Sequence, residues 1–428
     1  MTLKPVLHVG LVALGVTVLA AGPASQQDQP YRENLPANHA AIAYHTGPFE
    51  DPVALLAQAV ASGAATLDYD EQFGYLPSLL DRLDIRVDSQ ALVFSKTSLQ
   101  APLISPRTPR SIYFSDAVAV GFVQGSAVIE LAAFDPRRGT VFYTLATARA
   151  DRPRFARPSR CLRCHQAAAT LGVPGPYVGS VSTSASGRPD FRLGTVVTDH
   201  RTPFEERWGG WYVTGTHGDQ QHRGNVRGRD PATPAGLVAA ANHNLTTLTR
   251  FVDPNDYLVP TSDLVALMTL EHQTHMINLF TRAGWEARIA DEDGRLTRRE
   301  TVDRRNGVDE IVRYMLFADE APLRDPIRGV STFTETFPMR GPRDSRGRSL
   351  RDLDLETRLF RHPLSYMIYS DLFDGLPDPV RAAVYTRLFE VLTDDAPDRF
   401  ERLSAEDRQA ILEILRETKV ALPEYWSR

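Results

Sequence analysis

Residues 111–145 read SIYFSDAVAVGFVQGSAVIELAAFDPRRGTVFYTL. Short runs of hydrophobic and β-branched residues alternate here with turn residues, which is the pattern of consecutive β-strands. Asp135, Pro136 and Gly139 predict the loop of a hairpin between two of these runs. We therefore expect an antiparallel sheet with flanking helices, whose strands cover residues 91–94, 111–114, 117–123, 127–134 and 140–145.

Toward the N-terminus, the sequence predicts the helices that flank this sheet. Asp51 and Pro52 have the residue types of an N-cap and a first helical position, and they precede an apolar run over residues 53–61. A second helix is expected at residues 76–83. Together with the strands, these helices make residues 31–150 an α+β region.

The middle of the chain, residues 151–255, has the composition of a loop-rich region. It opens with arginines and prolines and continues into a stretch rich in Gly, Pro, Ser and Thr from Gly172 to Gly228. Such a composition is typical of loops, and a peripheral sheet is the alternative. The short strands expected here cover residues 177–182, 191–198 and 211–214.

From residue 256 to residue 428 the hydrophobic pattern is that of helices. The strongest pattern is a periodic run over residues 264–282, which follows the capping residue Asp263 and is expected to stop at Gly284. Residues 337–348 predict a loop. The whole chain is thus expected to be α+β, with a β-rich N-terminal part, a loop-rich middle and a helical C-terminal part. Further helices are expected at residues 308–317, 350–360, 365–373, 379–392 and 405–418.

The first 25 residues predict a secretory signal peptide. Lys4 precedes a mostly apolar stretch from Val6 to Gly22, and small residues follow it, which is the order of a signal peptide and its cleavage site. A retained N-terminal anchor is the alternative, although a spanning helix needs about 20 apolar residues. No later segment is apolar enough to cross a bilayer. We therefore expect no transmembrane segment after signal removal, and a periplasmic or secreted protein.

The global charge predicts no nucleic-acid partner. The chain carries a formal net charge of -5 over 428 residues, so it lacks the basic excess with which proteins neutralise phosphates. It contains two cysteines, Cys161 and Cys164, which are too close in sequence to stabilise a fold by a disulfide. Binding must therefore be inferred from local motifs.

The local motif with chemical content is Cys161-Leu162-Arg163-Cys164-His165. Covalent haem attachment needs two thiols that reach the two vinyl-derived carbons of one porphyrin, and an imidazole directly after them to bind the iron. In these five residues the chain resembles the c-type cytochromes. The resemblance implies one haem c bound through Cys161 and Cys164, with His165 as the proximal iron ligand.

Other interpretations of the cysteine pair are a redox-active dithiol, half of a zinc site or an accidental spacing. A dithiol is expected at a helix start after a strand, whereas this pair follows an arginine- and proline-rich linker. A zinc site needs two more ligands, which His217 and His222 would have to supply because the chain has no other cysteine. An exported protein also favours haem attachment over these alternatives.

The second axial position of the iron has four candidate ligands, His217, His222, His272 and Met339. His217 and His222 lie in a glycine-bounded segment, where the alternative is a solvated surface turn. His272 lies on the apolar stripe of the helix expected at residues 264–282, and its alternative role is that of a hydrogen-bonded core histidine. Met339 either reaches the iron from a loop or fills a packing gap.

Arginines around the motif have two possible roles. Arg157, Arg160 and Arg163 either neutralise haem propionates or form a basic docking rim for an acidic electron partner. Solvated side chains with neither role are the simplest alternative.

The sequence therefore predicts an exported monohaem c-type cytochrome that transfers electrons to a redox partner protein. The length of the chain supports an alternative, a peroxidase-like haem oxidoreductase with an open distal side where polar groups assist proton transfer. A haem-based sensor or binding scaffold is a third possibility. The residues that would assist proton transfer in the oxidoreductase are His217, Arg223, Glu271 and His272.

Overall fold

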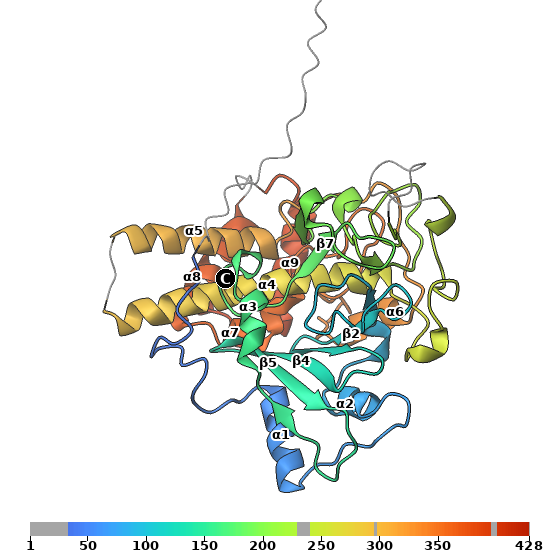
Figure 1. Ribbon diagram of the computed structural model, residues 1–428. Helices are drawn as coiled ribbons and strands as arrows, with labels where there is room; N and C mark the ends of the chain where they lie inside the picture. The colour runs from blue at the N-terminus through green and yellow to red at the C-terminus, as the bar shows by residue number, and fades with distance from the viewer. Residues whose placement is uncertain (1–32, 229–239, 295–297, 395–399, 428) are drawn as a thin grey trace, which may run out of the picture.

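The computed structural model describes residues 33–228, 240–294, 298–394 and 400–427 (Figure 1). The signal peptide expected at residues 1–25 lies outside this part of the chain. Within it, strands concentrate in the N-terminal half and helices in the C-terminal half. The predicted α+β fold class is thereby confirmed.

The centre of the N-terminal half is a seven-stranded antiparallel sheet with the strand order β6-β5-β4-β3-β2-β1-β9. Its register pairs Asp135 with Gly139, which confirms the predicted hairpin. The five predicted strands are all present, with ends that differ by one residue from those expected. The strands of the sheet are β1 (Ala91–Val93), β2 (Arg110–Phe114), β3 (Val118–Phe122), β4 (Val128–Asp135), β5 (Gly139–Ala146), β6 (Phe155–Ala156) and β9 (Trp211–Tyr212).

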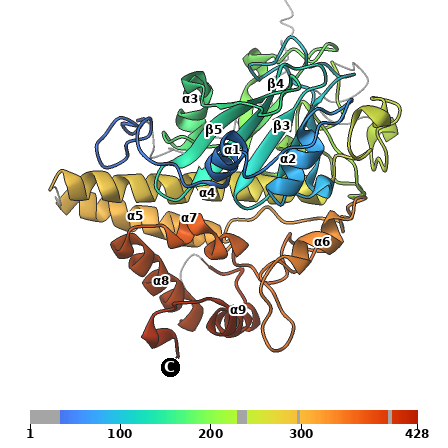
Figure 2. The same cartoon turned by 90° about the horizontal axis from the view of Figure 1, so that it is seen from below.

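The two faces of the sheet are covered by different helices. Successive side chains of a strand point to opposite faces, and Ile129 and Leu131 of β4 share one core with α1 (Pro52–Ser62) and α2 (Leu76–Arg82). The opposite face lies against α4 (Leu264–Glu292), which crosses behind the strands in Figure 2. Helices α1 and α2 occupy the two positions that the sequence predicts.

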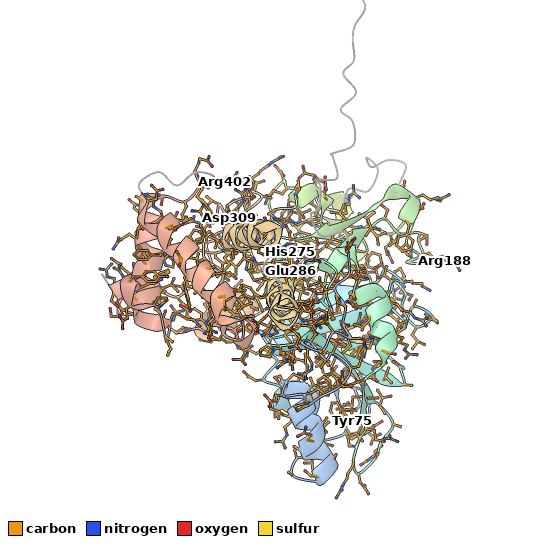
Figure 3. The ribbon with its side chains drawn as sticks, turned by 90° about the vertical axis from the view of Figure 1, so that its left-hand side faces the viewer. Tyr75, Arg188, His275, Glu286, Asp309 and Arg402 are labelled. Carbon is orange, nitrogen blue, oxygen red and sulfur yellow. The ribbon has the colours of Figure 1, made fainter. Side chains whose placement is uncertain are left out.

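Helix α4 connects the two halves of the molecule. Its N-cap is Asp263, whose carboxylate accepts the backbone N–H groups of Val265 and Ala266. Figure 3 shows His275 and Glu286 on this helix in the middle of the molecule, between the C-terminal helices and the sheet. The largest core accordingly combines side chains of the sheet, of α4 and of the C-terminal helices. Although α4 is long, neither it nor any other helix in the described ranges is apolar enough to cross a membrane.

The prediction that this helix stops at Gly284 is wrong, because α4 continues past it. A glycine inside a helix costs about 1 kcal/mol relative to alanine. The burial of the next residue offsets this cost, since Trp285 is fully buried and contacts Tyr44. Arg282 and Glu286 add an ion pair along the same turn, with 2.6 Å between Arg282 Nε and Glu286 Oε1.

The C-terminal part consists of helices that pack beside α4 (Figure 1). The helices predicted at residues 308–317, 379–392 and 405–418 are present. The sequence does not predict α6, whose last residues fall in the loop expected at residues 337–348. The helices of this part are α5 (Arg298–Met315), α6 (Phe333–Met339), α7 (Asp371–Asp374), α8 (Asp378–Thr393) and α9 (Ala405–Thr418).

The helix predicted at residues 350–360 is wrong. The chain forms turns there, and an isolated bridge joins Leu353 to Phe360. The carboxylate of Asp354 accepts three of the backbone N–H groups that follow it, which gives the backbone an alternative to helical hydrogen bonds. Leu355 also has a left-handed backbone, with φ 63°, and a helix cannot pass through that conformation.

The helix predicted at residues 365–373 is divided at Ser370. The backbone of Ser370 is extended, and its hydroxyl accepts the N–H of Phe373, so this residue caps α7. A 3-10 helix (Tyr366–Tyr369) precedes it. The prediction of one continuous helix is therefore wrong.

The middle part of the chain contains short elements joined by loops, as the composition predicts. The short helix α3 (Leu162–His165) is followed by a two-stranded antiparallel sheet of β7 (Val178–Val181) and β8 (Thr195–Thr198). The strand predicted at residues 191–198 is shorter than expected, because Gly194 has a positive φ of 81° and separates a 3-10 helix from β8.

Candidate functional site

The Cys161–His165 segment lies at the surface on a short helical turn. A 3-10 helix (Ser159–Cys161) leads directly into α3, so both cysteines belong to one run of helical backbone. Residues three positions apart lie on the same face of a helical turn. Cys161 is half-buried, Cys164 is exposed, and neither is in a disulfide. The segment therefore presents two free thiols on one face.

The imidazole of His165, at the end of α3, is oriented by a backbone carbonyl. Its Nδ1 lies 2.9 Å from the oxygen of Gly175, and because a carbonyl only accepts hydrogen bonds, Nδ1 carries the proton. The Nε2 atom of the neutral ring is then an acceptor, and none of the described residues forms a hydrogen bond with it. The ring packs on Phe142 of β5 and on Tyr177, with centroid distances of 4.8 Å and 5.6 Å. Burial lowers the pKa of His165, which keeps the ring neutral.

The loop that carries Gly175 is held against α4. The side-chain amide of Asn278 donates to the oxygen of Pro176 at 2.9 Å, and the backbone N–H of Gly175 donates to the oxygen of His165 at 2.9 Å. A Cβ at position 175 would lie 1.8 Å from Oδ1 of Asn278, so this close approach requires glycine. Helix α4 thus positions the loop, and the loop positions the imidazole.

A partly buried ion pair lies on the sheet near the segment. The guanidinium of Arg110 on β2 is 2.8 Å from the carboxylate of Glu130 on β4. Both charges act on the thiol of Cys161, whose pKa is raised by burial and by Glu130, while Arg160 and Arg110 oppose the rise. Neither Arg110 nor Glu130 is among the site residues predicted from the sequence. A charged side chain inside an otherwise apolar strand is the signal that points to them.

His217 and His222 form a separate cluster with His243. His217 and His222 are buried with their Nε2 atoms 3.2 Å apart, and His243 packs on His217 with a centroid distance of 4.4 Å. Burial and the neighbouring His243 lower the pKa of His217 to about 4. The contacts of both candidate ligands with other described residues do not include the Cys161–His165 segment.

The length of α4 separates this histidine cluster from the segment. The strand before His217 meets α4 at its first residue, where the N–H of Leu264 donates to the oxygen of Thr214 at 2.9 Å. The loop of Gly175 meets α4 at Asn278. Fourteen residues of helix span about 21 Å at 1.5 Å per residue, so the two loops contact α4 at well-separated points.

His272 and Met339 also lie in other surroundings. His272 is fully buried, with its Nδ1 2.8 Å from Nδ1 of His200 and its Nε2 2.7 Å from the hydroxyl of Ser365. Burial lowers the pKa of His272 to about 3. These are the surroundings of a hydrogen-bonded core histidine. Met339 is the last residue of α6 and is 70% exposed. The structure brings neither residue into contact with His165.

A network of ionisable residues lies at the end of β8 and on α4, where His275 is one helical turn before Asn278. Asp199 is the residue that follows Thr198, the last residue of β8. Asp199 pairs with Arg201 at 2.7 Å and lies 3.8 Å from His275 of α4. Arg201 holds the pKa of Asp199 below its usual range despite burial. The sequence does not single out this network, because its members become neighbours only when the hairpin packs on α4.

Glu271, a predicted proton-transfer residue, is buried in an ion pair on the same helix. Its carboxylate lies 3.2 Å from the guanidinium of Arg207. Burial raises the pKa of Glu271 to about 7, although Arg207 opposes the rise. Its Oε1 atom has no hydrogen-bond partner among the described residues. Arg223, the other predicted residue of this kind, donates its backbone N–H to the oxygen of Arg207 at 2.9 Å.

The residues of the segment fit a covalently attached haem. A covalently attached haem requires two thiols and an imidazole nitrogen that can bind iron. The segment has two free thiols on one helical face and a His165 Nε2 that no described residue engages. The zinc alternative needs His217 and His222 beside the two cysteines. These histidines contact each other and His243 instead, so the four residues do not come together.

Comparisons with other proteins leave this chain without a significant match among protein-family models, curated proteins and solved structures.

Proposed function

We propose that the chain carries one haem c, bound covalently through Cys161 and Cys164, with His165 as the proximal iron ligand. The observation that supports this most strongly is the fixed tautomer of His165, whose Nδ1–H donates to Gly175 and whose Nε2 has no partner among the described residues. Iron- and zinc-binding histidines have the same arrangement, in which an acceptor behind the ring sets its orientation and its basicity. A dithiol needs no imidazole held in this way.

Bound haem supplies an iron that accepts and releases single electrons. The protein residues would hold it in place. The two thiols would add across the two vinyl groups to form thioether bonds, and the Nε2 of His165 would bind the iron. The oxygen of Gly175 keeps the proton on Nδ1, and Asn278 holds that loop against α4. Phe142 and Tyr177 limit the motion of the imidazole ring by packing on it.

We infer electron transfer to a redox partner protein, by an exported protein, as the function. Exchange with a partner requires a haem that the partner can approach, and Cys164 is exposed. Arg160 and Arg163 are exposed beside it, and they form no ion pair with the described residues. Arg157 instead donates to the backbone oxygen of Tyr44 at 3.0 Å, so its role is structural. The exposed arginines suit a partner with an acidic docking surface.

The haem proposal is tested by producing the full chain in a host that attaches haem c and recording the pyridine haemochrome spectrum after denaturation. We expect the band of a haem with two thioether bonds, at one haem per chain. The double variant Cys161→Ala with Cys164→Ala should lack this band in the denatured chain. A haem that acidified acetone extracts from the native sequence would contradict covalent attachment.

A second candidate function is that of a peroxidase-like haem oxidoreductase. The observation that favours it is the network of Asp199, Arg201 and His275, because such groups can hold and move protons. His275 lies one turn of α4 before Asn278, which contacts the loop of Gly175. Visible absorption of the purified protein distinguishes the two functions. An electron carrier has a six-coordinate low-spin iron, whereas an oxidoreductase or a haem-based sensor has a high-spin iron that shifts on adding peroxide, cyanide or carbon monoxide.

A further inference from the structure

The Arg110–Glu130 ion pair is built into the sheet in an unusual way. Arg110 is on β2 and Glu130 is on β4, with β3 between them, and Gly121 of β3 pairs directly with Glu130. The guanidinium crosses β3 at this glycine, where a Cβ would lie 2.3 Å from Arg110 Nη2. Glycine inside a strand often marks such a close approach. Gly121 thus makes the space in which the two charges meet.

The pair lies on the face of the sheet that contacts the haem-binding histidine. Glu130 is opposite Thr144 of β5, and the adjoining Ala132 is opposite Phe142, so all four side chains point to the same face. The ring of His165 packs on Phe142 at 4.8 Å. Both charges lie within electrostatic range of His165 and of Cys161.

Stability alone is a poor explanation for this pair. The side chains of Arg110 and Glu130 are only 22% and 21% exposed, and partial burial makes both charges costly to remove from water. Their atoms are close but poorly aligned, because Arg110 Nε and Glu130 Oε2 have no hydrogen-bond partner in the described part of the chain. The same partial burial reduces screening by water and salt, so each charge acts strongly on its surroundings.

We propose that the Arg110–Glu130 pair sets the reduction potential of the haem iron held by His165. This inference rests on the proposed haem attachment. Reduction adds one electron at the iron, so a nearby cation stabilises the reduced form and a nearby anion stabilises the oxidised form. Arg110 therefore raises the reduction potential of the iron and Glu130 lowers it. With both charges present, the potential lies between the values expected with either charge alone.

The test is the midpoint potential of the full-length haem protein, measured by spectroelectrochemistry. Arg110→Gln is expected to lower the potential, because Glu130 is left alone, and Glu130→Gln is expected to raise it. The midpoint potential of the double variant, Arg110→Gln with Glu130→Gln, should lie between those of the two single variants. Arg110→Lys keeps the charge and should stay close to the native potential. If Arg110→Gln does not fold, the rise in potential expected for Glu130→Gln still tests the proposal.

A matched control is Arg346→Gln, which breaks an ion pair with Glu413 on α9. Helix α9 lies across the molecule from α3 in Figure 2, so the potential should not change. Single variants that shift the potential in the same direction, or not at all, would overturn this proposal while haem attachment stands. A native chain without a pyridine haemochrome band would instead show that the proposed function itself is wrong.

Discussion

His165 carries the proposed chemistry through one tautomer of its ring. The carbonyl oxygen of Gly175 holds the proton on Nδ1, and this leaves Nε2 as the nitrogen that can bind iron. Gly175 can approach the ring only because it has no side chain to collide with Asn278. Gly175 and Asn278 thus determine which nitrogen of the His165 ring has a free lone pair.

Replacing His165 by alanine should change the iron coordination and leave the covalent bonds intact. We expect the pyridine haemochrome band of denatured His165→Ala to match that of the native chain, because both cysteines remain. The visible spectrum of the folded variant should shift, and added imidazole should restore it by occupying the vacated position. The control is His217→Ala, whose histidine lies in the separate cluster with His222 and His243. An unchanged spectrum for His165→Ala, or a shifted one for His217→Ala, would contradict the assignment.

Glu320 should make stability depend on pH. Burial raises the pKa of Glu320 to about 7, although the backbone N–H of Leu359 and nearby arginines oppose the rise. Between about pH 4.5 and 7 the unfolded chain is ionised at this residue while the folded chain remains protonated, so the free energy of unfolding falls as the pH rises. Glu320→Gln keeps the acceptor for Leu359 and removes this fall. Between pH 4.5 and pH 8, the free energy of unfolding of the variant should rise by up to about 3 kcal/mol relative to that of the native chain.

Chemical denaturation at several pH values measures this difference. Glu320 and Glu401 both line one surface pocket, but Glu401 is exposed. Glu401→Gln is therefore the matched control, and its pH profile should parallel that of the native chain. A Glu320→Gln profile that also parallels the native one would show that the Glu320 carboxyl is not held protonated by the fold.

Among the elements, α4 determines where the site residues lie. It contacts the sheet, the loop of Gly175 and the C-terminal helices. Its N-cap Asp263 is fully buried and also accepts the N–H groups of Val330 and Ser331. The start of the helix is thereby tied to a segment from the C-terminal part.

Asp263→Ala should destabilise the protein strongly. The substitution removes a helix cap and leaves several buried N–H groups without an acceptor, which together should cost about 3 to 5 kcal/mol. Ser404→Ala, which removes the cap of α9 at an exposed position, should cost only about 1 kcal/mol. Thermal and chemical unfolding compare the two variants. Equal losses would mean that the start of α4 is not the connection that we infer.

The helices also show how far the sequence predicts the fold. Helices α8 and α9 form where the sequence predicts them. Only α9 of these two has a side-chain cap, a capping box formed by Ser404 and Asp407. The failures have local causes that periodicity does not reveal: the Asp354 carboxylate competes for backbone N–H groups, and Leu355 takes a left-handed conformation. At Gly284 the failure has a tertiary cause, because the burial of Trp285 outweighs the low helix propensity of glycine.

For the molecule as a whole, the candidate site is only partly predictable from the sequence. Cys161, Cys164 and His165 are adjacent, so their spacing is visible in the chain. Arg110 and Glu130 become neighbours through the register of three strands, and Asp199 meets His275 only because the β7–β8 hairpin packs on α4. Such contacts depend on packing, which no local pattern encodes. For the same reason, the three histidines predicted for the second axial position contact other partners, and Met339 is exposed.

The exposed arginines should make electron exchange depend on charge. With ferricyanide, an anionic mediator, the rate should fall as ionic strength rises, and Arg160→Gln with Arg163→Gln should lower it roughly two- to tenfold at low salt. With a cationic cobalt phenanthroline complex, both trends should reverse. Stopped-flow absorbance measures these rates.

The control for this measurement is Arg346→Gln with Arg381→Gln, on the side of the molecule that α8 and α9 form, away from α3 (Figure 2). It changes the net charge of the protein equally but should leave both rates close to native. If the two double variants behave alike, only the total charge matters and Arg160 and Arg163 do not form a docking surface.

The mass of the intact, denatured polypeptide shows whether a haem is covalently attached to the chain. If thioether bonds join a porphyrin to Cys161 and Cys164, the native chain has the mass of the polypeptide plus one haem, and the Cys161→Ala, Cys164→Ala variant has the mass of the polypeptide alone. A native chain at the bare polypeptide mass, with two thiols that react with an alkylating reagent, would contradict the claim.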